Sequence, residues 1–573
     1  MNRNDALKQL KEETYDLCII GAGASGAGCA LDAALRGLKV ALIDRSDFAS
    51  ETSGKSTKLI HGGVRYLEQA FKKLDFAQLR QVKHGLNERS ILISIAPHLT
   101  QPLGLVTPVF HWWQGLYYWI GLKLYSWFAH WDASKNHPPM PGSKWLNKQK
   151  ALQLIPGLSP RIHSAVLYYD GQMNDTRFAL ALIQSAVNSG NCTAANYLEV
   201  LSLEKNDQHQ ITAVSVKNLA ADHSEPSEFN IRAKVFLNCT GPFADSIRKM
   251  ANPDLTSRIR PSKGVHLTLP NAILGGNYAL LIPKTSDGRM VFALPFEGET
   301  ILGTTDEPYQ TMSNEPVLQA SEVRFLLDTL QPYLSKPVIT GAVQAGFGGL
   351  RPLLAANTGA GARHTKSMLR DHEVETDSKS RLISLMGGKW TTYRIMAKDA
   401  VDVACRILHH PFGMMHIPSS NTQNYKLEGA QNYSPAILET LLQSGSLSES
   451  TCQHLTRTYG GKAFDVTSLI QENPELKQLV HPEYPFICAE IVYSVRQEMA
   501  LSIRDFLARR IRLEILNWNA SRQAASTVAM WMSKELNWTP DMMESNILAY
   551  QKLIDSFIDQ ANTASNSSHS PIL

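Results

Sequence analysis

The chain has 573 residues, of which 43% are hydrophobic and 19% charged, a composition typical of globular proteins. This length predicts about two to four domains and excludes the fibrous and low-complexity classes. The formal net charge of +4 is small for the length, so we expect no nucleic-acid partner and at most a local basic pocket.

The seven cysteines form no close CxxC pair. Their odd number and wide spacing favour reduced thiols in a cytoplasmic compartment over a disulfide framework, and we expect no metal site. The first residues, MNRNDALKQLKEETYD, lack the apolar core of an export signal. We therefore expect the protein to face the cytoplasm.

The first elements predicted along the chain form a β-α-β unit. Residues 16–44 read as a buried strand, a glycine-rich turn, a helix and a second strand. In the turn, the GxGxxG pattern of Gly21, Gly23 and Gly26 lets backbone amides and a helix N-terminus approach a pyrophosphate. Asp44 follows Gly26 by 18 residues, where it is placed to accept hydrogen bonds from a ribose. The unit predicts a dinucleotide site.

Three later segments favour FAD over NAD at this site. Residues 46–68, SDFASETSGKSTKLIHGGVRYLE, are irregular and rich in Ser, Thr and Gly, as expected of a stretch that lies along an extended cofactor. A strand-like run, KVFLNCTG, closes on Thr240 and Gly241, and GGKWTTYR at 387–394 reads as a helix start whose amides face a flavin. Distant segments converging on one dinucleotide indicate a flavin domain interrupted by an insertion.

Residues 110–131, FHWWQGLYYWIGLKLYSWFAHW, are rich in Trp and Tyr. The segment has too many polar residues and too few aliphatic ones for a transmembrane helix. Two interpretations stay open: a helix whose aromatic side chains pack against another domain, or a peripheral contact at the headgroup level of a membrane.

The C-terminal part is predicted to be helical. A polar linker precedes it at 415–432, and the run AEIVYSVRQEMALSIRDFLARRIRLEIL repeats apolar residues at helical spacing. We expect a packing domain at 425–555 that supports a homodimer, followed by a disordered tail at 556–573.

Several motifs together resemble one family, the FAD-dependent glycerol-3-phosphate dehydrogenases of the D-amino-acid-oxidase-like group. They are GAGASGAG with Asp44, STKLIHGGVRYLE, NCTGPFAD, KGVHLTL, ILGTTD, GLRPL and GGKWTTYR. HGGVRYLE and GGKWTTYR are specific to the family, whereas the glycine fingerprint is shared far more widely.

The resemblance implies an α/β fold: a Rossmann-like FAD-binding domain, an inserted mixed-sheet substrate domain and a C-terminal α-helical domain. The expected boundaries are 14–95, 155–250 and 340–412 for the FAD-binding domain, and 96–154 and 251–339 for the insert.

The resemblance also implies oxidation of sn-glycerol 3-phosphate to dihydroxyacetone phosphate, with electrons passing through FAD to a membrane quinone. We then expect a protein that is peripheral on the inner face of the cytoplasmic membrane. Two alternatives stay open: an oxidase that uses oxygen and forms hydrogen peroxide, and a membrane-docked flavoprotein that binds without catalysis.

A phosphomonoester carries about two negative charges, which arginine and lysine recognise well. The expected substrate-binding residues are Arg65, Tyr66, Arg351, Arg370 and Lys389.

The expected catalytic residues are His61, His266, Arg351 and Lys389. Imidazole titrates near the working pH and suits a general base, but the sequence does not rank the two histidines. An arginine beside the substrate oxygen is a second way to stabilise an alkoxide. The expected cofactor-binding residues are Gly21, Gly23, Gly26, Asp44, Thr52, Ser53, Lys58, Thr240, Gly241, Gly388, Lys389 and Thr391.

Overall fold

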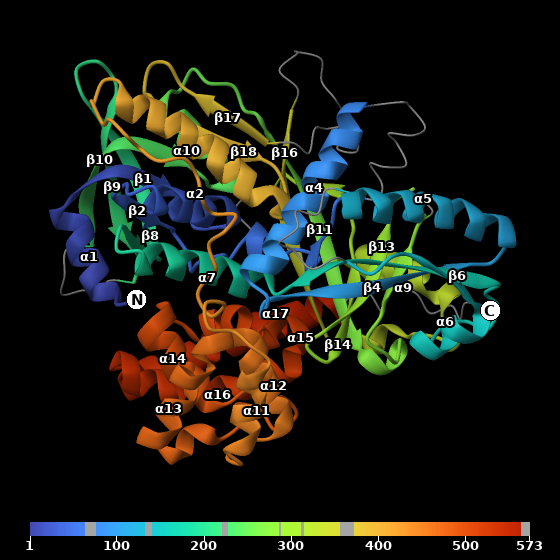
Figure 1. Ribbon diagram of the computed structural model, residues 1–573. Coiled ribbons are helices and arrows are strands. Elements are labelled where there is room, and N and C mark those ends of the chain that lie inside the picture. The colour runs from blue at the N-terminus through green and yellow to red at the C-terminus, as the bar shows by residue number, and fades with distance from the viewer. Residues whose placement is uncertain are drawn as a thin grey trace.

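The computed structural model describes residues 1–63, 76–131, 140–220, 227–285, 288–310, 315–355 and 372–562. It contains two large sheets, with a group of helices from the C-terminal part of the chain packed below them in the view of Figure 1.

The first sheet has a parallel centre, in the order β18-β10-β1-β2-β7, with β17 beyond β18 and the antiparallel pair β8 and β9 attached to β10. Its strands are β1 Thr14–Ile20, β2 Val40–Ile43, β7 Cys192–Ala195, β8 Leu198–Lys205, β9 Ile211–Asn218, β10 Glu228–Asn238, β17 His372–Thr376 and β18 Ile383–Gly387. The predicted β-α-β unit is therefore present. Of the strands that were expected to end at the dinucleotide, β10 pairs with β1 and β18 pairs with β10.

Both faces of this sheet are covered, which explains the continuous apolar run of β1. Leu17 and Ile19 pack with the helices on one face, whereas Cys18 and Ile20 belong to a separate core on the other. The helices around this sheet are α1 Arg3–Glu12, α2 Ala24–Leu35, α7 Asp175–Asn188, α8 Ala244–Ala251 and α10 Tyr393–His409.

The second sheet is mixed, in the order β15-β11-β14-β13-β12-β4-β6-β3, with β16 paired to β11 and β5 to β6. Its strands are β3 Leu59–Ile60, β4 Thr100–Val109, β5 Lys144–Asn147, β6 Ser164–Met173, β11 Ile259–Pro270, β12 Ala279–Ile282, β13 Val291–Phe296, β14 Glu299–Gly303, β15 Glu307–Pro308 and β16 Ala345–Leu354. The helices that follow or precede them are α4 Phe76–Ile95, α5 Trp112–Trp131, α6 Lys148–Leu154 and α9 Ala320–Leu330.

The C-terminal helices share one apolar core with the second sheet. They are α11 Ala436–Gln443, α12 Glu449–Tyr459, α13 Ala463–Glu472, α14 Cys488–Glu498, α15 Leu513–Leu516, α16 Trp518–Leu536 and α17 Pro540–Asn562, with a π-helical turn at Asp505–Arg510. Thr268 of β11 donates a hydrogen bond to the carbonyl of Ile515, at 2.6 Å, across this contact. The expected fold class, a flavoprotein-like α/β body with a mixed-sheet domain and a helical C-terminal domain, is confirmed.

Two details differ from the sequence-based expectation. Residues 556–562, which we expected in a disordered tail, continue α17, because Ile554 and Phe557 are buried in the C-terminal core. The strands β6 and β16 belong to the second sheet, where β6 pairs with β4 and β16 with β11, although their residues fall inside stretches that we assigned to the FAD-binding domain. The domain boundaries themselves stay a prediction.

Candidate functional site

The glycine turn after β1 brings backbone atoms very close together. Gly21 has a φ of +102°, and a Cβ atom at Gly26 would lie 1.8 Å from the carbonyl oxygen of Gly21. Neither position accepts a side chain in this geometry. The turn therefore leaves the start of α2 accessible to a ligand, as the anion-binding interpretation requires.

Asp44 stands at the end of β2, next to this turn. Its carboxylate accepts hydrogen bonds from the amide of Ala22, at 2.7 Å, and from the amide of Ser46, at 2.9 Å. Burial raises the pKa of this carboxyl to about 6, and the negative charges of Asp47 and Glu51 act in the same direction. The two amides fix the carboxylate at the edge of the cavity that the turn borders.

This first cavity has a volume of about 370 Å³ and joins the ends of β1, β2, β10 and β18. Nine of the residues expected to bind the cofactor line it: Gly21, Gly23, Asp44, Thr52, Ser53, Thr240, Gly241, Gly388 and Lys389. The glycine cradle, the anchored carboxylate and the lining of the cavity by four strand ends fit FAD.

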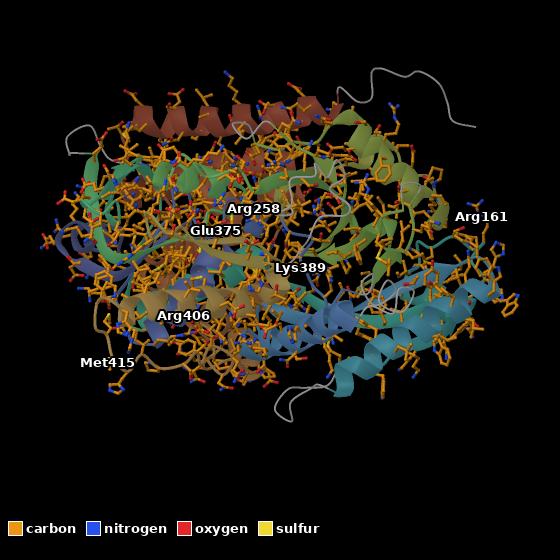
Figure 2. The ribbon with its side chains drawn as sticks, turned by 90° about the horizontal axis from the view of Figure 1, so that it is seen from above. Arg161, Arg258, Glu375, Lys389, Arg406 and Met415 are labelled. Atoms are coloured by element: carbon orange, nitrogen blue, oxygen red, sulfur yellow. The ribbon has the colours of Figure 1, made fainter. Side chains whose placement is uncertain are left out.

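A second cavity, of about 330 Å³, adjoins the first. The two share the residues Thr52, Pro352, Gly388, Lys389 and Trp390 in their walls. The second cavity is lined by strands of the second sheet and by the segment that follows β18 of the first sheet. Lys389, in that segment, lies near the middle of the molecule in the view of Figure 2. A cofactor in the first cavity would reach the second one at Lys389.

Four expected catalytic residues, His61, His266, Arg351 and Lys389, all line the second cavity, together with Thr391. Thr391 also joins two of the family motifs, because its hydroxyl accepts a hydrogen bond from the amide of His61 at 3.3 Å. The structure thus brings together the HGG and GGKWTTYR segments, which are far apart in the sequence.

Arg351 extends from β16 across the neighbouring strand β11. Its Nη2 atom donates to the hydroxyl of Thr304 at 3.0 Å, and its Nη1 atom lies 3.4 Å from Asp306 Oδ1. A Cβ atom on Gly264 would lie only 2.4 Å from Nη2 of Arg351. The guanidinium therefore rests directly on the bare backbone of Gly264.

His266 is buried beside the same cavity. Its ring stacks on Phe347, with centroids 4.7 Å apart, and its Nε2 atom lies 2.9 Å from the hydroxyl of Thr57. Its Nδ1 atom has no hydrogen-bond partner among the described residues. Burial, with the charges of Lys58 and Arg351, holds the pKa of His266 well below its usual range. His266 is therefore neutral at physiological pH, whereas His61 is only partly buried.

Lys58 does not take the cofactor-binding place that we expected. Its ammonium is fully buried and donates to Asp175 at 2.7 Å, and also to the carbonyls of Gly54 and Ser56. It lines neither cavity. Burial lowers the pKa of Lys58 to about 7, although Asp175 opposes this shift. The side chain connects the segment before β3 to Asp175 at the start of α7.

Gly26 shapes the turn but does not line the cavity. Arg65, Tyr66 and Arg370 lie outside the described residues, so their role in substrate binding stays a prediction.

Sequence reasoning missed several residues of the second cavity. Thr304 and Asp306, which contact Arg351, belong to the ILGTTD motif. Their membership of a family motif could have marked them as site residues. Tyr168 and Asp170 of β6 also line the cavity. No local pattern marks them, because they read as part of an ordinary strand.

Helix α5 exposes four of the seven aromatic side chains that the structure describes on it. Trp112, Trp113, Tyr117, Ile120 and Trp127 are between 47% and 64% exposed. The interpretation in which the aromatic side chains of this segment all pack against another domain is therefore wrong for the four exposed aromatic residues, Trp112, Trp113, Tyr117 and Trp127. Within the described ranges, we find no helix with the length and apolar character needed to cross a membrane.

Comparison with known proteins places this architecture. Residues 16–394 match the family described as FAD dependent oxidoreductase, and residues 420–543 match the C-terminal domain of alpha-glycerophosphate oxidase. The mitochondrial glycerol-3-phosphate dehydrogenase of Rattus norvegicus is 42% identical over 92% of this chain and 71% of its own. That of Arabidopsis thaliana is 37% identical over 97% of this chain and 88% of its own.

Among solved structures, the glycerol-3-phosphate dehydrogenase of Bacillus halodurans, complexed with FAD, superposes with a TM-score of 0.75. It is 26% identical and covers 99% of both chains. These matches agree with the cavity geometry, and the cofactor of this chain is FAD.

Proposed function

Because the chain belongs to the family of FAD-dependent glycerol-3-phosphate dehydrogenases, we propose that it oxidises sn-glycerol 3-phosphate to dihydroxyacetone phosphate. The observation that carries the proposal is the second cavity, where Arg351, Lys389 and two histidines adjoin the FAD-binding cavity. The reaction removes a hydride from the secondary carbon and a proton from its hydroxyl. When bound, FAD supplies the hydride acceptor.

The cations of the cavity bind and orient the substrate in this proposal. Arg351 presents a planar guanidinium whose position is fixed by Thr304, Asp306 and the backbone of Gly264, so it offers a defined donor pair to a substrate oxygen. Lys389, in the wall between the two cavities, holds the substrate against the cofactor side. Fixed donors of this kind stabilise an alkoxide as the hydroxyl proton leaves.

The proton passes to His61 in this proposal. The pKa of His266 is held well below its usual range, which makes its ring a poor proton acceptor near neutral pH. His266 therefore serves as a neutral hydrogen-bonding group beside Thr57. His61 is partly exposed at the cavity, and its backbone is fixed by Thr391. A positioned general base accelerates such steps about 10²- to 10⁴-fold.

We extend the proposal to the electron acceptor, a quinone in a membrane that the protein contacts through α5. The exposed aromatic side chains of α5 suit the headgroup level of a bilayer. Their surroundings are basic: Lys144, Lys148 and Lys150 are exposed, and Asp132 is the only acidic residue between Glu88 and Asp170. Figure 1 shows α5 along the outer side of the second sheet, away from the C-terminal helices.

An anionic membrane surface complements this combination of aromatic and basic residues. The inner face of the cytoplasmic membrane, where anionic headgroups face the cytoplasm, is the location that we propose. Flotation with anionic liposomes tests it, and a double variant, Trp112→Ser with Trp113→Ser, is expected to lose most of the floated fraction. A variant that floats like the unmodified protein would exclude α5 as the contact.

Oxygen is the second candidate acceptor. It is favoured by one observation, the match of residues 420–543 to the C-terminal domain of an alpha-glycerophosphate oxidase. The hydride step is the same in both cases. Oxygen uptake with stoichiometric hydrogen peroxide, in the absence of any quinone, would favour the oxidase, whereas turnover that depends on added quinone favours the dehydrogenase.

The substrate is tested by anaerobic mixing of the FAD-loaded protein with glycerol 3-phosphate, glycerol, lactate or a D-amino acid. Loss of the oxidised flavin absorbance is expected with glycerol 3-phosphate alone. Arg351→Ala should lose most of this reduction while keeping its FAD, because Arg351 lines only the second cavity. A protein whose flavin stays oxidised with glycerol 3-phosphate would refute the proposal.

A further inference from the structure

Beside the second cavity, three buried side chains from three different elements form a chain of hydrogen bonds that ends at the backbone amide of Gly62, the residue after His61. We propose that Tyr125, Asp170 and Arg89 are positioning residues that fix this backbone and thereby set the place of His61. The inference rests on the proposed function of the cavity. None of its three residues was marked by the sequence.

The contacts form one continuous chain. The amide of Gly62 donates to the hydroxyl of Tyr125 at 2.8 Å, and this hydroxyl donates to Asp170 Oδ1 at 3.0 Å. Nη1 of Arg89 donates to the same carboxylate oxygen at 2.5 Å. The direction of these hydrogen bonds is fixed. The backbone amide of Gly62 can only donate, so the single proton of the Tyr125 hydroxyl goes to the Asp170 carboxylate.

The three side chains come from separate parts of the fold. Arg89 is on α4, Tyr125 on α5 and Asp170 on β6, and each is about 1% exposed. Figure 1 shows α4 and α5 next to each other at the edge of the second sheet. Packing of these elements therefore decides where the acceptor for the Gly62 amide stands.

The segment is also confined sterically. A Cβ atom on Gly62 would lie 2.7 Å from Leu86 Cγ and 2.9 Å from the hydroxyl of Tyr125. The Gly62 backbone thus rests on α4 and α5 with no space for movement toward them. The hydrogen bond to Tyr125 opposes movement in the other direction, into the cavity that His61 lines.

Helix α4 holds the second motif segment as well. Glu88, the neighbour of Arg89, accepts from Arg394 Nε at 2.9 Å, and both side chains are buried. Arg394 belongs to the GGKWTTYR segment that carries Lys389. Two adjacent residues of α4, Glu88 and Arg89, therefore contribute to fixing both segments. In this way they help to set the distance between His61 and Lys389.

Stability alone does not explain this arrangement. A buried ion pair such as that of Arg89 and Asp170 often gives no more stability than apolar side chains of the same volume, because both charges lose their hydration. What the pair does provide is a carboxylate held in one place, which directs the Tyr125 hydroxyl toward Gly62. Asp170 also lines the second cavity, so the chain of contacts ends at the site itself.

The test removes only the hydroxyl, with Tyr125→Phe, and measures anaerobic flavin reduction by glycerol 3-phosphate in a stopped-flow instrument. Because misplacement of a reacting group by about 1 Å costs up to about 10²-fold, we expect the limiting reduction rate to fall about 10- to 100-fold. The apparent dissociation constant for the substrate, the FAD content and the melting temperature are expected to change little.

A matched control is Tyr459→Phe. Tyr459 is also buried and donates to a carboxylate, Glu490, at 3.0 Å, but it lies in the C-terminal helices and lines neither cavity. It should leave the reduction rate unchanged. Asp170→Asn is a second variant at the network, and combining it with Tyr125→Phe should slow reduction no further than the slower single variant, since both act through Gly62.

Normal reduction rates in both Tyr125→Phe and Asp170→Asn would overturn the inference. A lower FAD content or a lower melting temperature, with an unchanged reduction rate per bound flavin, would also overturn the inference. That result would indicate a structural role only. These results differ from failure of the proposed function, in which glycerol 3-phosphate would not reduce the flavin of the unmodified protein.

Discussion

Replacing Gly264 by alanine adds one methyl group beneath the guanidinium of Arg351. The new Cβ atom would lie 2.4 Å from Nη2 and 2.6 Å from Nη1, far inside ordinary contact distance. Gly264 sits in β11 without a positive φ, so its backbone accepts alanine. The guanidinium is the end of a long side chain, and it is therefore the group that moves.

The size of the effect follows from this overlap. Ordinary van der Waals contact begins at 3.4 Å, so Nη2 must shift by about 1 Å and leaves its hydrogen bond to Thr304. A displacement of about 1 Å in a positioning group costs up to about 10²-fold in rate. We therefore expect kcat/KM for glycerol 3-phosphate to fall about 100-fold, equivalent to about 2.7 kcal/mol of transition-state stabilisation.

The assay is steady-state turnover with glycerol 3-phosphate and an artificial electron acceptor, with FAD content and thermal unfolding measured on the same samples. Gly142→Ala is the matched control, since a Cβ atom there would meet no atom within 4 Å. The unfolding temperature of Gly264→Ala is expected to stay near that of the unmodified protein, because the strand gains a methyl group and only a side-chain end moves.

A double variant shows whether the effect passes through Arg351. In an Arg351→Ala background the methyl group has nothing to displace, so adding Gly264→Ala should change kcat/KM by less than about threefold. A large further loss in that background would refute this explanation, as would Gly264→Ala with normal kcat/KM.

Three further outcomes are expected. Burial raises the pKa of Asp44 to about 6, and the ionised carboxylate is the better acceptor for ribose hydroxyls. The affinity for FAD should therefore fall as the pH drops below 6, by up to about tenfold per pH unit. In flavin-fluorescence titrations, the affinity of Asp44→Asn for FAD should not depend on pH in this range. The pKa of His266 is already far below its usual range. His266→Gln should therefore lower kcat without moving the midpoint of the acidic limb of the pH–rate profile. A moved midpoint would assign that limb to His266. Glu88→Ala leaves Arg394 buried without its carboxylate, which should cost about 3–5 kcal/mol of unfolding free energy in urea denaturation; a loss below about 1 kcal/mol would contradict the buried-pair argument.

Local sequence patterns were sufficient for the dinucleotide site. The strand, the turn at Gly21 and Gly26 and the carboxylate of Asp44 lie within about 30 residues, and their geometry is set by backbone conformation and by strand and helix periodicity. The ends of β10 and β18 were also placed correctly, because apolar runs that stop at glycine or threonine mark the edge of a parallel sheet. The fold class followed from these elements and from the family motifs.

Lys58 shows where local reasoning fails. A lysine beside a glycine-rich cofactor segment suits an anion, and the sequence alone gives no reason to exclude that role. Its ammonium is instead bound by Asp175 of α7, whose other oxygen faces Arg512 from the C-terminal helices. Residues 117 and 454 positions away thus decide whether the lysine faces a ligand.

By itself, the sequence determined the cofactor turn, the order of the elements and a set of cofactor-binding and catalytic candidates that the structure brings to the walls of the two cavities, because each depends on a short stretch of chain. Tertiary structure alone decided the ionisation of His266, the seating of Arg351 on Gly264 and the chain of contacts from Arg89 through Asp170 and Tyr125 to Gly62. Burial and hydrogen-bond partners set these properties, and both come from elements that are distant in sequence and meet only when the two sheets and the helices around them pack together.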